Sequence, residues 1–106
     1  MNSSAQLDRS FLALSHPARR AIVARLSHGS ATVTEATASL PLSKPAISKH
    51  LKVLEDAGLL ERRIEGRTHR LRLDSRAIDE AVVWLERHRR IWEAKLDTVE
   101  DWLSSS

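Results

Sequence analysis

The chain has 106 residues, of which 42% are hydrophobic and 29% are charged, so it can form one globular domain with a modest core. It contains no cysteine, which excludes disulfides, thiolate nucleophiles and thiolate metal sites. The N-terminal segment lacks the apolar stretch of a signal peptide, and no apolar run approaches the roughly 18 residues of a membrane span, so we expect a cytoplasmic protein.

The net charge of +3 is unevenly distributed along the chain. Residues 41–73 hold eight basic and four acidic side chains, whereas residues 74–106 hold five basic and eight acidic ones. A nucleic-acid-binding surface needs a local excess of positive charge, because neutralisation of phosphates supplies most of the non-specific affinity. The middle of the chain is therefore the candidate region for binding a nucleic acid.

Two helices are expected before residue 30. The first covers about residues 7–14. The second begins at Ser15-His16-Pro17, where Ser or His can cap the helix and Pro loses no needed N–H bond, and Gly29 ends it. Apolar residues at helical spacing indicate the first helix, namely Leu7, Phe11 and Leu14. The second helix is expected to bury one face, formed by Ala18, Ala21, Ile22 and Leu26.

The segment from Thr32 to Gly58 is predicted to form two helices joined by a turn of three or four residues. Thr32 and Glu35 have the spacing of a capping box at the start of the first helix, and Pro41 ends that helix. Ser43 can cap the second helix, and the glycine suits the position after its end. The residues predicted to be buried are Val33, Ala36 and Leu40 in the first helix and Ile47, Leu51 and Leu54 in the second.

The polar face of the second helix is basic. A short helix, a turn and a second helix with such a face form a helix-turn-helix, whose second helix can enter a DNA major groove. An ordinary solvated helix can carry the same residues, so spacing alone leaves both interpretations open. The side chains on this face are Lys44, Ser48, Lys49 and Lys52.

The string SKPAISKHLKVLEDAGLL resembles the recognition helix of the ArsR-type winged-helix transcriptional regulators, for which S-x-P-x-[VI]-S-x-H-L-x-x-L-x-x-A-G-L is typical. The resemblance extends upstream to LSHPARRAIVARL and downstream to a basic segment, and covers about residues 7–104. It implies a mainly α winged helix-turn-helix fold with five helices and a two-stranded wing between helices 4 and 5. It also implies a homodimer that binds DNA.

After residue 58 the apolar spacing changes from helical to alternating, and Gly66 supplies a turn. This pattern predicts a β-hairpin over about residues 59–73. A solvated hairpin is one interpretation, but the resemblance favours a wing that lies against DNA beside the recognition helix. Leu60, Ile64, Leu71 and Leu73 are assigned to the core face, and Arg62, Arg63, Arg67, His69, Arg70 and Arg72 to the other face and the tip.

Asp74 or Ser75 can cap a final helix over Arg76 to Leu103, which would be about 42 Å long. So small a domain does not need this length for its own core. One apolar stripe is expected to pack on the domain and another on a second copy, the alternative being a helix folded back in a monomer. The stripes are Ile78, Val82, Leu85, Trp92, Leu96, Val99 and Leu103, and Ala81, Trp84, His88, Ile91 and Trp102.

The chain carries no catalytic motif, because a Gly-rich phosphate loop, a G-x-S-x-G string and cysteines are all missing. His50 on the recognition helix suits DNA binding or packing better than catalysis, and His88 with its neighbouring glutamates gives too few ligands for a metal. ArsR-type metal sensors carry either cysteines where this chain has Thr34, Ala36 and Thr37, or sets of Asp, His and Glu on the last helix, where this chain lacks paired histidines. The chain resembles the branch of the family that does not sense metals. We therefore expect no enzymatic activity, no metal and no cofactor.

The sequence thus predicts one DNA-binding domain over residues 1–106 that represses transcription as a homodimer on a pseudo-palindromic operator. The alternative is a winged-helix module for protein or RNA, which predicts an acidic or apolar recognition face. No pattern identifies a small-molecule effector. The expected DNA contacts are Ser43, Lys44, Pro45, Ser48, Lys49, His50, Lys52, Arg63, Arg67, His69 and Arg70, and the expected dimer interface, on terminal helices of about 7–14 and 76–103, is Leu7, Phe11, Leu85, Trp92, Leu96, Val99 and Leu103.

Overall fold

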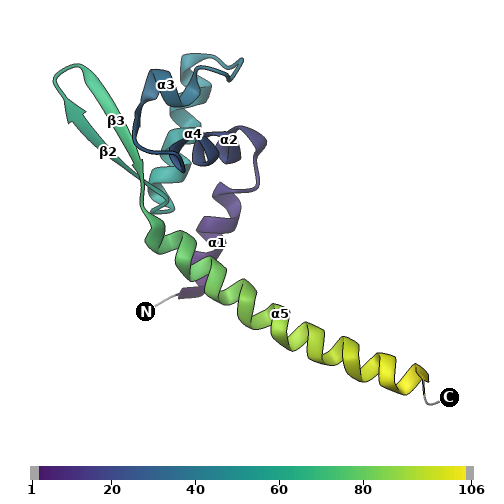
Figure 1. Ribbon diagram of the computed structural model, residues 1–106. Coiled ribbons are helices and arrows are strands. Elements are labelled where there is room, and N and C mark those ends of the chain that lie inside the picture. The colour runs from purple at the N-terminus through teal and green to yellow at the C-terminus, as the bar shows by residue number, and fades with distance from the viewer. Residues whose placement is uncertain (1–2, 105–106) are drawn as a thin grey trace.

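A computed structural model describes the backbone of residues 3–104 and the side chains of residues 5–95 and 102–104. The chain forms a compact N-terminal part from which one long helix extends, giving overall dimensions of 68 × 34 × 22 Å (Figure 1). The elements are α1 (Ser3–Ala13), α2 (Pro17–Leu26), β1 (Ala31–Thr32), α3 (Val33–Thr37), α4 (Lys44–Asp56), β2 (Leu60–Glu65), β3 (Thr68–Leu73) and α5 (Ser75–Ser104).

The core lies between α2, α4 and one face of the sheet. Its largest fully buried side chains include Ile22 of α2, Leu51 and Leu54 of α4, and Leu71 of β3. Burying a side chain of this size contributes about 1.5–3 kcal/mol relative to leaving it exposed. The predicted apolar faces of the two helix-turn-helix helices are confirmed, with Leu51 and Leu54 buried and Ile47 partly buried against the core.

Three strands form an antiparallel sheet in the order β1-β3-β2. The hairpin of β2 and β3 is the predicted one, and Gly66 in its turn has a φ of 63°, which a residue with a side chain rarely adopts. The third strand was not expected from the sequence. It has only two residues, and it pairs Ala31 with Leu71 and Thr32 with Arg70. A segment of two residues is too short to show the alternation that identifies a strand.

The helix starts follow their capping residues. Thr32 and Glu35 form the predicted capping box, with bonds of 2.9 and 3.1 Å, and this contact lowers the pKa of the Glu35 carboxyl. His16 caps α2 through its ring, and Ser43 caps α4 through its hydroxyl. These side chains fix where α2, α3 and α4 begin, and so fix the helix-turn-helix.

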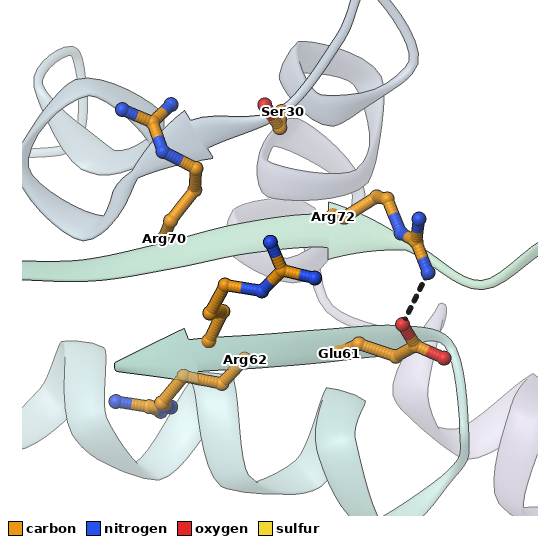
Figure 2. Close-up of a pocket in the computed structure, with 6 residues that line it drawn as sticks. Ser30, Glu61, Arg62, Arg70 and Arg72 are labelled. Atoms are coloured by element: carbon orange, nitrogen blue, oxygen red, sulfur yellow. Dashed lines mark hydrogen bonds and ion pairs between the residues drawn. The ribbon is translucent and has the colours of Figure 1, made fainter. Parts of the chain in front are cut away.

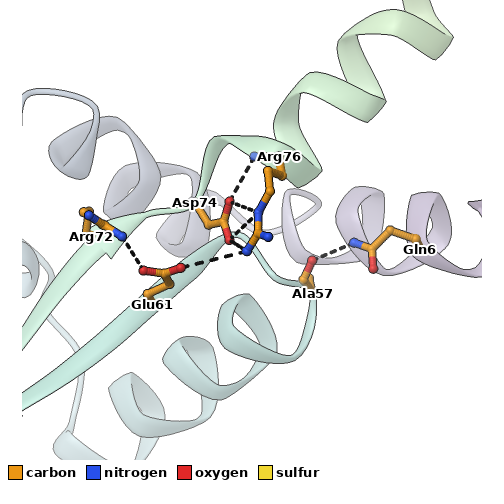
Figure 3. Close-up of polar contacts among 6 residues, drawn as sticks. All are labelled: Gln6, Ala57, Glu61, Arg72, Asp74 and Arg76. Carbon is orange, nitrogen blue, oxygen red and sulfur yellow. Dashed lines mark hydrogen bonds and ion pairs between the residues drawn. The ribbon is translucent and has the colours of Figure 1, made fainter.

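Two helix boundaries differ from the prediction. α1 begins at Ser3 rather than near residue 7, and its Gln6 donates a 2.7 Å bond to the Ala57 carbonyl, which ties this extra turn to the end of α4 (Figure 3). α3 ends at Thr37, so the connection to α4 is longer than three or four residues. Pro41 disfavours a helical conformation for Leu40 and has no N–H to donate to the Thr37 carbonyl, so the helix does not reach Leu40.

Two residues predicted to be buried are exposed. Ala21 lies on the solvent side of α2, because the face that packs is formed by Ala18, Ile22 and Leu26. Ile64 is 64% exposed, because it lies near the hairpin turn, beyond the buried part of the sheet. Alternation correctly predicts which side Ile64 faces but not how far the core reaches.

The long helix α5 begins at Ser75, directly after Asp74, which binds its first turn. The Asp74 carboxylate accepts the Arg76 backbone N–H at 3.0 Å and binds the Arg76 guanidinium at 2.5 Å, which lowers the pKa of Asp74 to about 2 (Figure 3). The first turns of α5 pack on the domain through buried Ala77 and Ala81, and the rest extends away (Figure 1). In the described part of the chain, no helix combines the length and apolarity that crossing a bilayer requires.

Candidate nucleic-acid interface

The face of α4 opposite its buried leucines is open and basic. Lys44 and Pro45 lie in the first turn, directly after the capping Ser43, and all three residues are exposed. The next turns expose Ser48 and Lys49, and then Lys52. Lys52 lies 3.4 Å from Asp56, while no salt bridge is seen for Lys44 or Lys49 among the described residues. Two lysines and one serine hydroxyl near the start of α4 are therefore available to an outside partner.

The hairpin places Arg67 next to the start of α4. Arg67 is exposed in the turn after Gly66, and the hairpin and α3 lie at the end of the domain farthest from the extended part of α5 (Figure 1). Arg67 and Lys44 border one open cleft of about 650 Å³, so the hairpin tip and the first turn of α4 flank a shared surface. Its lining is Thr32, Val33, Thr34, Lys44, Arg62, Arg67, Thr68 and His69.

The hairpin has two chemically different faces. The core-side face, formed in β2 by Leu60, Arg62 and Ile64, lies toward α4, and the outer face bears Glu61, Arg63 and Glu65. In β3, His69 lies opposite Ile64 on the core-side face and Arg70 lies opposite Arg63 on the outer face. The prediction that Arg62 and His69 share the other face with the remaining arginines is therefore wrong, because the register places both with the buried leucines.

Arg62 links the hairpin to α4. Its guanidinium donates to the Glu55 carboxylate at 2.5 Å and lies 2.9 Å from His69 Nδ1. The two charged side chains are only 24% and 33% exposed, so water screens this pair less than an open surface pair. Sequence analysis missed this contact because no local spacing rule relates the end of a helix to the middle of the next strand.

His50 faces α2 rather than the open face of α4. Its ring lies 4.4 Å from the His16 ring, and its Nδ1 lies 3.1 Å from Arg19 Nη1. Arg19 also donates to the carbonyls of Leu12 and Ala13, at 3.0 and 2.7 Å. The pKa of His50 is lowered, first by burial and then by the neighbouring His16 and Arg19. The geometry therefore gives His50 a packing position, one of the two roles that the sequence left open.

The comparisons with known proteins agree on one family. Residues 14–63 match a family model described as a helix-turn-helix domain. The transcriptional regulator Rv2034 of Mycobacterium tuberculosis is 48% identical over 67 residues, which are 63% of this chain and 63% of that protein. A transcriptional repressor of Bacillus subtilis, SdpR, is 29% identical over 71% of this chain and 83% of its own length.

A crystal structure of an ArsR family transcriptional regulator is 34% identical to the chain, with a TM-score of 0.79, and the match covers 84% of this chain and 92% of that one. The chain belongs to the ArsR family. Its mainly helical fold, with the wing between α4 and α5, is that of the winged helix-turn-helix regulators, as the sequence resemblance implied. In these terms α4 is the recognition helix and the β2-β3 hairpin is the wing.

The ArsR chain exposes large apolar side chains along α5. Leu85 is 51% exposed and Trp92 is 61% exposed, and Leu103 is exposed as well. Of the residues predicted on the first helix, Leu7 is half-buried, and Phe11 contacts the ring of Trp84 edge-on at 5.9 Å. Leu96 and Val99 also belong to the predicted interface, and their side chains lie outside the described part of the chain.

Metal-ligating side chains do not converge in the described residues, where no group of three or more His, Asp or Glu could hold an ion. His88 stacks on Trp84 with ring centroids 4.0 Å apart. The carboxylates nearest to it along α5, those of Glu86 and Glu93, pair with Arg89 instead. This part of α5 is therefore arranged for stacking and ion pairing.

Proposed function

We propose that this ArsR-family chain binds a pseudo-palindromic DNA operator as a homodimer and represses transcription by covering a promoter. The observation that carries the proposal is the juxtaposition of the exposed basic start of the recognition helix with Arg67 at the wing tip, across one open cleft. The name of the B. subtilis relative, a transcriptional repressor, supports the direction of regulation. The proposed site of action is the cytoplasm, and no metal, cofactor or catalytic step is involved.

In the proposed complex, the first half of α4 enters the major groove. Ser48 and Lys49 face outward one turn into the helix, where helix-turn-helix proteins read base edges. Ser43, Lys44 and Pro45 bring the N-terminus of α4 to the DNA backbone, where the Lys44 side chain and the positive end of the helix dipole attract a phosphate. Lys52 and Arg67 add phosphate contacts on either side.

The wing extends this contact along the DNA. Arg63, Arg67 and Arg70 are the arginines of the hairpin that we assign to the DNA backbone or the minor groove. His50 and His69 act by holding the recognition helix and the wing in place, because each is half-buried against an arginine of its own chain. Phosphate contacts supply affinity and register, while the α4 contacts supply sequence preference.

The experiment begins with selection of bound duplexes from a random DNA pool, which yields the operator and its symmetry. The double variant Ser48→Ala, Lys49→Ala is then titrated with that operator, and it should lose about 1–3 kcal/mol of binding free energy for each base contact removed. Its thermal unfolding should match that of the parent, because both side chains are exposed. Arg90→Ala, which removes one positive charge from exposed α5, is the matched control and should bind like the parent.

Parent-like operator binding by the folded double variant would mean that α4 does not read DNA. The alternative function is a winged-helix module for RNA or protein. A protein-binding module predicts an acidic or apolar face on α4, whereas the observed face is basic, and an RNA-binding module would need a basic face as well. The same selection distinguishes the two functions, because an RNA-binding module would enrich no duplex sequence but would retain single-stranded or hairpin RNA.

A further inference from the structure

The outer face of the wing contains a second basic pocket. It has a volume of about 320 Å³ and is bounded by residues of β2 and β3 together with Ser30, just before β1. Arg70 and Arg72 lie on the same side of the sheet as Ser30, whereas Arg62 points toward the helix beneath (Figure 2). The pocket thus opens on the face of the wing opposite the one that lies toward the recognition helix.

Two arginines in this pocket face each other across the strands. Arg63 and Arg70 are direct partners in the β2-β3 register, an arrangement that destabilises a sheet when like charges are not compensated. The Arg70 guanidinium lies 3.9 Å from the Glu65 carboxylate and also interacts electrostatically with the carboxylate of Glu35. No hydrogen bond or salt bridge is seen for the Arg63 side chain within the described part of the chain. The positive charge of Arg63 therefore has no acidic partner there, whereas the charge of Arg70 is compensated in part.

The one acidic side chain of the pocket is already engaged. Glu61 accepts a 2.6 Å bond from Arg72, and its other oxygen lies 4.0 Å from Arg76 at the start of α5 (Figure 3). These contacts hold Glu61 at the end of the pocket nearest α5, while Arg63 and Arg70 lie farther along the hairpin. Glu61 therefore pairs with Arg72 and Arg76 and not with the opposed arginines.

We propose that this pocket binds a phosphate-type oxyanion held between Arg63 and Arg70, with the Ser30 hydroxyl at its border. Guanidinium groups bind phosphate oxygens through two parallel N–H bonds, and an anion between the two arginines would remove their mutual repulsion. The phosphate can belong to a free phosphorylated small molecule or to the DNA backbone beside the operator. Only the second source rests on the proposed function.

The test uses inorganic pyrophosphate as the probe, titrated at constant ionic strength and followed by the NMR shifts of the arginine side-chain N–H groups. The parent should show saturable shifts at Arg63 and Arg70. Arg63→Gln and Arg70→Gln should each weaken binding at least tenfold, and Arg63→Lys, which keeps the charge but loses the two-pronged geometry, should weaken it less. Arg90→Gln on α5 has the same loss of charge and should bind like the parent.

Non-saturable shifts in the parent, or equal weakening by Arg90→Gln, would overturn the proposal, because either result indicates general charge screening. A second arm identifies the source of the phosphate. If pyrophosphate competes with operator DNA for the parent but not for Arg63→Gln, the natural ligand of the pocket is a phosphate of the DNA backbone. If pyrophosphate binds the parent without displacing the operator, the natural ligand is a free phosphorylated small molecule. If no operator is found, the pyrophosphate titration without DNA still shows whether the pocket binds an oxyanion.

Discussion

His50 is the side chain whose protonation should affect folding. A guanidinium can only donate hydrogen bonds, so His50 Nδ1 must accept from Arg19, and the ring must be neutral to do so. His16 Nδ1 likewise accepts the backbone N–H of Ala18 at the start of α2. Two adjacent imidazoles and one arginine therefore share a junction between α2 and the recognition helix, and the lowered pKa of His50 disfavours its protonation there.

The sign of the pH dependence follows from the lowered pKa of His50. The unfolded chain binds this proton more readily than the folded one, so the contribution to stability is complete above the unfolded pKa of about 6.5 and declines as the pH falls through it. We expect the free energy of unfolding, measured with denaturant, to decrease from pH 7.5 to pH 5.5. His50→Gln should remove part of that decrease, whereas His28→Gln, at an exposed position, should keep it. An identical slope in His50→Gln and the parent would contradict this interpretation.

At the scale of elements, the contact between Arg62 and Glu55 holds the wing against α4. Glu55→Gln should cost about 1–2 kcal/mol of unfolding free energy, because it removes a charged partner from a half-buried guanidinium. It should also weaken operator binding, since the wing loses its fixed angle to the recognition helix. Asp56→Asn breaks the neighbouring exposed pair with Lys52 and should cost less than about 0.5 kcal/mol.

The exchange variant Glu55→Arg, Arg62→Glu tests whether the contact itself matters. Partial recovery of stability and operator affinity, relative to Glu55→Gln, would indicate that an ion pair at this position sets the wing. Equal costs for Glu55→Gln and Asp56→Asn in denaturant unfolding would show that the contact is only a surface pair.

The sequence predicts elements well where one residue decides the outcome. Thr32, Ser43 and Gly58 mark helix ends, because capping and a positive φ depend on the local chain alone. The sequence predicts side-chain positions less well where residues distant in the chain determine them. The exposure of Ile64 depends on how far the core extends beneath the wing, and the inward position of Arg62 depends on the register and on Glu55.

In the candidate site, too, local residues determine some features and distant residues determine others. The exposed face of α4 follows from helical spacing, and the structure places Ser48 and Lys49 where the sequence does. The positions of His50 and His69 do not follow from spacing, because arginines that are distant in sequence or on the neighbouring strand hold them. The pocket on the outer face of the wing also needs the strand register, since Arg63 and Arg70 become partners only when the hairpin is paired.

At the scale of the whole molecule, the 30-residue helix α5 is longer than packing on its own domain requires. Its first turns are buried, but Val82, Leu85, Ile91 and Trp92 are exposed along its length. So many exposed large apolar side chains on one helix are unusual for a monomer and indicate an interface. DNA half-sites lie about 34 Å apart, so two recognition helices must be held at a fixed spacing. A second copy packed along α5 meets both requirements, and we propose it as the partner.

Leu85→Glu tests this dimer. In a two-fold symmetric interface each substitution occurs twice, and removing a buried leucine costs about 1.5–3 kcal/mol per copy before the cost of burying a charge is added. We expect light scattering to show a folded monomer, tryptophan emission to shift to the red, and tight operator binding to be lost although α4 is unchanged. Ala94→Glu adds the same charge to an exposed position on the opposite side of the helix and should remain dimeric. If the Leu85→Glu variant stayed dimeric, or bound the full operator tightly as a monomer, the interface would have to lie on another element.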